Sequence, residues 1–241
     1  MAKDKSPFYR VCIDCNAIEK PACQPLNGHD VKEYDAVTSV LGVINKPELV
    51  AWAAREGARA GDAQAHVRIA KDAAQRGTDL HAYINERLAG RVPLGLSPDA
   101  EVYRPAADRW LEEMKPRAVL LNRPVWSRTK AYCGTLDAIL AYGDRVYLTD
   151  FKTVRAADKL RYPPYWEHEL QTEAYRRAHM ELLGDTTKGR SIVRFAPEGA
   201  YRIATWDDAE LNNRCFLAFS AAITLYREQR RRKRENKEGA E

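Results

Sequence analysis

Apolar side chains recur every three to four residues in two parts of the chain, a spacing typical of helices that bury one face. Pro47 stands at a favoured first-turn position, Trp52 is expected to anchor its helix in the core, and Thr78 is expected to cap another helix. The predicted helices are Val37 to Ile44, Pro47 to Arg59, one beginning at Gly77-Thr78, Ala100 to Met114, Glu167 to Leu183, and Asp208 to about Arg234.

A different pattern occupies the middle of the chain. Ala118 to Val154 is rich in Val, Leu, Tyr and Thr, with turn signals between the runs, and predicts a three-stranded antiparallel meander. Shorter strands are predicted at Ser191 to Phe195 and Tyr201 to Trp206. This order of elements indicates an α/β (α+β) class, with a mixed central sheet and its antiparallel meander flanked by helices.

One predicted hairpin brings acidic residues together. Gly143-Asp144 fits a two-residue turn, because glycine supplies the positive φ that a type II′ turn needs at its first central position. This register places Asp137 directly opposite Asp150. Lys152 follows on the same strand face, since side chains alternate with period two, and Thr135 would face it.

Two facing carboxylates repel, and a divalent cation held by their oxygens is the natural compensation. A metal bound there would lower the pKa of a bound water and stabilise charge on a phosphate, while Lys152 would orient that water or neutralise the transition state. The competing interpretation is chance. An Asp-x-Lys triplet is expected roughly once in such a chain, and a second copy occurs at Asp30-Val31-Lys32.

Length and composition favour one intracellular domain. The 241 residues are 45% hydrophobic, and we expect one main domain at 37–226, an irregular N-terminal extension with a cysteine cluster at 1–36, and a basic C-terminal helix end or tail at 227–241. No run resembles a signal peptide or membrane span, so a cytoplasmic location, in a bacterium or a phage-infected cell, is expected.

The formal net charge of +5 favours polyanionic partners without requiring them. Arg230 to Arg234 form an unbroken basic run near the C-terminus. This run fits a phosphate-binding patch or, equally well, a solvated helix end.

Four ordered motifs resemble the PD-(D/E)XK nuclease superfamily, specifically its RecB-like exonuclease branch. The resemblance spans Val37 to about Tyr175. Its motifs are Gly77-Thr78-Asp79-Leu80-His81 with Glu86, Gly134-Thr135-Leu136-Asp137, Asp150-Phe151-Lys152-Thr153, and Gln171-Thr172-Glu173-Ala174-Tyr175.

The resemblance implies a restriction-endonuclease-like core that binds Mg²⁺ or Mn²⁺. Its implied metal ligands are His81, Asp137, Asp150 and the backbone carbonyl of Phe151, with Lys152 catalytic. Supporting or DNA-contacting roles are implied for Gln171, Tyr175, Thr135 and Glu86. One departure concerns the strand before Gly134, where relatives often have a Glu and this chain reads Leu121-Asn122-Arg123-Pro124-Val125.

Five cysteines, an odd number at scattered positions, do not form a disulfide framework. An iron–sulfur cluster is not expected, because relatives that hold one place three of four cysteines near the C-terminus. A zinc site is conceivable, since Cys-x-x-Cys supplies two tetrahedral ligands, although the remaining pair lacks a standard spacing. Its ligands would be Cys12, Cys15, Cys23 and His29.

The leading functional hypothesis is a metal-dependent DNA nuclease, an exonuclease on DNA ends or single strands in recombination, repair or phage DNA metabolism. Its partners would be DNA and a single-strand annealing protein or helicase, with no membrane. A structure-specific or nicking endonuclease of the same fold is one alternative, and a catalytically silent DNA-binding module is another. Aromatic residues that could stack on bases, or serve only local packing, are Tyr132, Tyr162, Tyr165 and Trp166.

Overall fold

A computed structural model describes residues 8–12, 17–19, 31–184 and 187–239. These residues form a mixed eight-stranded sheet in the order β2-β1-β3-β5-β6-β7-β8, with β4 paired to β5 off this path. The strands are β1 (Phe8–Cys12), β2 (Ala17–Glu19), β3 (Val31–Ala36), β4 (Arg117–Ser127), β5 (Tyr132–Tyr142), β6 (Arg145–Thr153), β7 (Gly189–Phe195) and β8 (Tyr201–Trp206).

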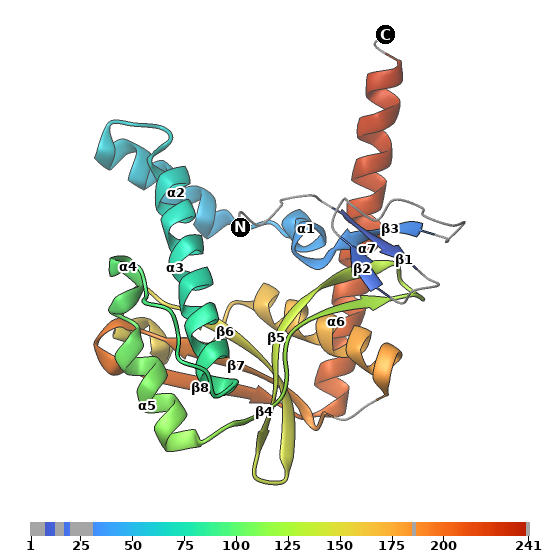
Figure 1. Cartoon of the computed structure of the whole chain (residues 1–241). Coiled ribbons are helices and arrows are strands. Elements are labelled where there is room, and N and C mark those ends of the chain that lie inside the picture. The colour runs from blue at the N-terminus through green and yellow to red at the C-terminus, as the bar shows by residue number, and fades with distance from the viewer. Residues whose placement is uncertain (1–7, 13–16, 20–30, 185–186, 240–241) are drawn as a thin grey trace.

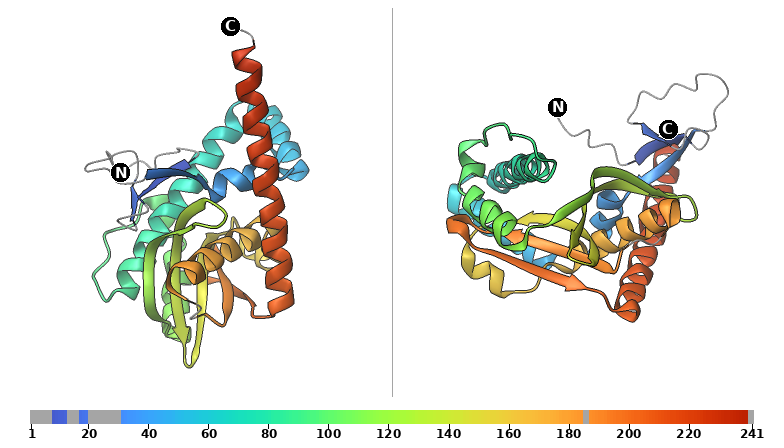
Figure 2. Two further views of the ribbon diagram at one scale, coloured as in Figure 1. Left: turned by 90° about the vertical axis from the view of Figure 1, so that its right-hand side faces the viewer. Right: turned by 60° about the horizontal axis from the view of Figure 1, so that its bottom comes forward.

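Helices cover both faces of the sheet (Figures 1 and 2). On one face α3 and α5 enclose a core around Leu80, Trp110 and Phe151. On the other, α6 and α7 enclose a core around Leu148 and Phe219. The helical segments are α1 (Val37–Val40), η1 (Leu41–Val43), α2 (Pro47–Ala60), α3 (Ala65–Leu88), α4 (Pro98–Glu101), α5 (Arg104–Met114), η2 (Ala157–Arg161), α6 (Trp166–Leu183), η3 (Pro197–Gly199) and α7 (Ala209–Glu238).

The predicted mixed α/β class is confirmed, and so is the register of the hairpin between β5 and β6. Ladder pairs run from Tyr142↔Arg145 to Ala138↔Thr149. Gly143 has φ +62°, while Asp144 keeps a negative φ, which is the pattern of a type II′ turn. The turn chemistry therefore set the register of the strands that follow it.

Several predicted helix boundaries were wrong. Gly77 and Thr78 lie inside α3 rather than at its start, and the Thr78 hydroxyl donates to the Ala74 carbonyl instead of capping. The helix expected over Ala100 to Met114 is divided into α4 and α5. Trp52 is half-buried rather than a core anchor: α2 has no buried residue, and the Trp52 indole packs edge-on against His66.

The stretch at 1–36, expected to be irregular, contributes β1, β2 and β3 to the sheet, because β1 pairs with both β2 and β3. The helix expected to end near Arg234 continues to Glu238 without interruption at residue 227. Cys15, Cys23 and His29 lie outside the described residues, and only the backbone of Cys12 is described, so the zinc hypothesis stays a prediction. Within the described part of the chain, no helix is both long and apolar enough to cross a bilayer.

Candidate active site

The candidate site lies in a fork between β5 and β6. The two strands pair as far as Ala138↔Thr149, after which the same edge of β5 pairs in parallel with β3 at Tyr132 and Cys133. Beyond Thr149, β6 continues to pair with β7 on its other edge. The strands therefore separate one pair before the predicted Asp137–Asp150 pair. The motif that contains Asp137, on β5, and the motif that contains Asp150, on β6, lie on the open edges of the fork.

Side chains bridge the fork in place of ladder bonds. The Phe151 amide donates to Asp137 Oδ2 over 2.9 Å. The Phe151 carbonyl accepts from His81 Nε2 over 2.7 Å, and His81 Nδ1 lies 3.3 Å from Asp137 Oδ1. Asp137, Phe151 and His81 thus form a closed ring of polar contacts that ties α3 to the sheet.

Asp150 and Lys152 occupy the β6 face that also carries Leu148, two residues apart along the strand. The Asp150 carboxylate is buried, and Lys152 Nζ lies 2.5 Å from its Oδ2. That oxygen accepts no hydrogen bond of good geometry. A buried carboxylate is unfavourable unless a cation compensates it, and in the described arrangement the ammonium of Lys152 is that cation.

Burial and the charges of the site shift the pKa values of Asp150 and Asp137 in opposite directions. Burial, assisted by the negative charge of Asp137, raises the pKa of Asp150 to about 6 despite the nearby ammonium of Lys152. Burial would also raise the pKa of Asp137, but His81, Lys152 and the Phe151 amide outweigh it and hold that pKa at about 2. Between about pH 2 and 6, Asp137 is therefore ionised while Asp150 is largely protonated.

These groups fit a hard divalent cation. Asp137, Asp150 and the Phe151 carbonyl offer oxygen ligands, the imidazole of His81 offers nitrogen, and Asp150 Oδ2 has no hydrogen bond of good geometry to give up. In the described arrangement, His81 and Lys152 contact the carboxylates directly, and no three acidic, histidine or cysteine side chains stand together as a closed metal-binding group among the described residues. Binding a cation would require these two side chains to release the carboxylates.

Two of the sequence motifs meet through a glycine. A Cβ atom on Gly134 would lie 2.4 Å from Cε1 and 2.9 Å from Oη of Tyr175. The Tyr175 ring is buried, and its hydroxyl accepts a 3.3 Å hydrogen bond from Gln171. Only glycine permits this approach, so Gly134 on β5 fixes where α6 presents Gln171 and Tyr175.

Two other predicted site residues lie outside this ring of contacts. Thr135 is exposed and pairs with Pro124 of β4. Glu86 forms an ion pair with Arg91, 2.5 Å apart, near the end of α3. The structure therefore brings together His81, Asp137, Asp150, Phe151 and Lys152, with Gln171 and Tyr175 beside them, and leaves Glu86 with a surface partner.

His168 is a residue of this region that the sequence motifs do not include. It lies half-buried on α6, and burial together with the positive charges of Lys152, Lys46 and Arg194 lowers its pKa to about 3. His168 precedes Gln171 by three residues and Tyr175 by seven, so the three side chains share one helical face. This helical spacing is the feature of the sequence that could have identified His168. The lowered pKa keeps its imidazole neutral close to Lys152.

In comparisons with known proteins, no family model matches the chain and no curated protein sequence matches it.

Proposed function

We propose that this chain is a divalent-metal-dependent deoxyribonuclease with a restriction-endonuclease-like core, acting as an exonuclease on DNA ends or single strands. One observation supports it above all: four groups that can each ligate a divalent cation, from α3, β5 and β6, converge in the fork. They are the His81 imidazole, the carboxylates of Asp137 and Asp150, and the Phe151 carbonyl. Their resemblance to the PD-(D/E)XK motifs gives the proposed reaction.

The chain's own groups would divide the work. Asp137, Asp150, His81 and the Phe151 carbonyl would hold Mg²⁺ or Mn²⁺, and the bound cation would supply Lewis-acid activation of water and of the scissile phosphate. Lys152 would exchange its contact with Asp150 for a phosphate oxygen, where its ammonium neutralises developing charge. Since an ammonium rotates freely on a long stem, this exchange needs no backbone movement.

Tyr175 and Gln171 would shape the wall of the site opposite α3. The Tyr175 hydroxyl already accepts a bond from Gln171, so its own proton remains available to a phosphate oxygen. His168, held neutral, adds no positive charge beside Lys152.

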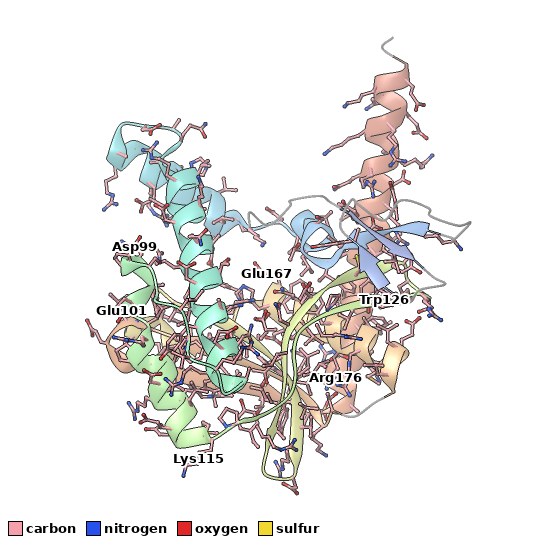
Figure 3. The ribbon with its side chains drawn as sticks, in the orientation of Figure 1. Asp99, Glu101, Lys115, Trp126, Glu167 and Arg176 are labelled. Carbon is pink, nitrogen blue, oxygen red and sulfur yellow. The ribbon has the colours of Figure 1, made fainter. Side chains whose placement is uncertain are left out.

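Cleavage of end-labelled single-stranded DNA tests this proposal. Wild type should degrade linear DNA with Mg²⁺ or Mn²⁺ and not with EDTA, and Asp150→Asn should be inactive while still folded. The matched control is Asp99→Asn, which changes an exposed carboxylate on α4 (Figure 3) and should keep wild-type activity.

Closed circular single-stranded DNA separates the modes of cleavage. Circles should survive if the protein requires an end, and their cleavage would replace the exonuclease with an endonuclease of the same site. No cleavage of any substrate with either metal would contradict the enzymatic proposal and favour a silent binding module.

A further inference from the structure

Exposed aromatic side chains gather in one short segment of the chain. Among the described residues, the aromatic side chains that are more than a third exposed are Tyr162, Tyr165 and Trp166, with exposed fractions of 49%, 69% and 53%. Single exposed apolar residues are common on protein surfaces, but three large rings within five positions are not explained by that tendency. Each of these rings keeps about half or more of its surface exposed, whereas Tyr132, the fourth aromatic residue considered from the sequence, is buried in the core and cannot stack on bases.

The segment is held in place rather than left loose. The Leu160 side chain is buried, and the Leu160 carbonyl accepts hydrogen bonds from Arg194 over 3.1 Å and from Arg202 over 3.2 Å. Pro163 and Pro164 restrict the backbone that follows. The rings are therefore displayed on an ordered support, which lowers the entropy lost when they bind a partner.

This segment is joined directly to the candidate active site. It connects the end of β6, which carries Lys152, to the start of α6, which carries Gln171. The Tyr165 ring packs edge-on against His168 with centroids 5.5 Å apart, and His168 lies within electrostatic range of Lys152. In Figure 3 the labelled Glu167, next to Trp166, lies on the side of the body from which α2 and the end of α7 project.

Basic residues accompany the rings. Between Arg155 and Trp166 the chain has three basic side chains, Arg155, Lys159 and Arg161, and one acidic side chain, Asp158. The Arg161 guanidinium stacks over the Tyr162 ring, 4.7 Å from its centroid. Aromatic rings beside exposed cations are the surface that recognises single-stranded nucleic acids, because bases stack on the rings and phosphates meet the cations.

We propose that Tyr165 and Trp166, with Tyr162 and Arg161 beside them, form a stacking platform for the unpaired bases of single-stranded DNA that enters the fork. This inference rests on the proposed function and adds its substrate class: the bases themselves, and not only the phosphate backbone, contribute to binding. In a duplex, the neighbouring base pairs of the stack cover both faces of each base, so the platform favours unpaired ends.

The test compares two probes in EDTA, a short oligothymidylate and an abasic phosphodiester chain of equal length. Wild type should bind the oligothymidylate more tightly, and only that probe should quench the fluorescence of Trp166, the one exposed tryptophan of the five. The double variant Tyr165→Ala/Trp166→Ala should lose about 5- to 150-fold in oligothymidylate affinity for each ring that stacks. Its affinity for the abasic chain should not change.

Two control variants make the result specific. Trp166→Phe should retain the preference for bases, because an aromatic face remains. Leu183→Ala removes a side chain of similar exposure, 56%, from the other end of α6 and should bind both probes as wild type does. Equal wild-type affinity for the two probes, or an equal loss for both in the double variant, would overturn the platform.

Cleavage by wild type with metal, measured separately on the same oligothymidylate, separates the two proposals. Cleavage without any preference for bases would remove the platform and leave the nuclease. A preference for bases without cleavage would leave the platform and remove the nuclease.

Discussion

Replacing Gly134 with alanine should destabilise the protein by pressing a methyl group into the Tyr175 ring. The added Cβ would lie 2.4 Å from Cε1 and 3.0 Å from Cζ of that ring, so ordinary contact requires a shift of about 1 Å. Tyr175 is only 4% exposed and cannot swing into solvent. Overpacking of this kind costs about 1 to 3 kcal/mol.

Urea unfolding of a double-mutant cycle measures this clash. Tyr175→Ala alone should cost about 3 to 5 kcal/mol as a large aromatic truncation. The double variant Gly134→Ala/Tyr175→Ala should be more stable than the sum of the single losses predicts, by about 1 to 3 kcal/mol, because the methyl group then occupies vacated space. Additive losses would refute the packing of β5 against α6 at this point, and with it the link between the two motifs.

Three further predictions concern charge. Asp150→Asn should stabilise the metal-free protein at pH 7 by at most about 3 kcal/mol, measured by urea unfolding. Because the pKa of Asp150 is raised to about 6, ionisation of this carboxyl lowers the free energy of unfolding as pH rises from about 4 to 6. The amide of asparagine does not ionise and so avoids this loss of stability. A destabilised Asp150→Asn variant would contradict this. The pKa of His168 is lowered to about 3, so below pH 6.5 the unfolded chain binds more protons than the folded protein does. The free energy of unfolding should therefore fall as pH falls from 6.5 towards 3. The variant His168→Gln should show a smaller fall, measured by urea unfolding at several pH values. Truncation after Arg232 keeps the ion pairs of Arg227 and Arg230 with Asp35 and should reduce the slope of log affinity for single-stranded DNA against log salt by about 0.7 for each phosphate that the removed residues neutralise; an unchanged slope would leave the end of α7 as a solvated helix.

Local chemistry explains which parts of the fold could be predicted. The register of β5 and β6 followed from one glycine in a two-residue turn and from alternation along the strands, both of which act over a few residues. The same register placed Asp137 and Asp150 on neighbouring strands. The position of His81 beside Asp137 was expected instead from the resemblance of separated motifs, since no local rule joins α3 to the sheet.

Tertiary packing explains the rest. The sequence predicts a helix start at Gly77, yet α3 runs through it, because the roughly 1 kcal/mol that an internal glycine costs is offset by packing of Leu80 and Ile84 in the core. The pairing of β1 with β3 joins segments separated by residues of no clear pattern. The fork itself depends on β5 changing partners from β6 to β3, which no window of the sequence displays.

A crystal soaked in Mn²⁺, with the metal located by its anomalous signal, would show whether the fork between β5 and β6 binds the cation. We expect one strong peak in the fork, within coordination distance of Asp137, Asp150, the Phe151 carbonyl and His81, with Lys152 turned away from Asp150. A protein that cleaves DNA with Mn²⁺ but shows its anomalous peak elsewhere, or none in the fork, would contradict it.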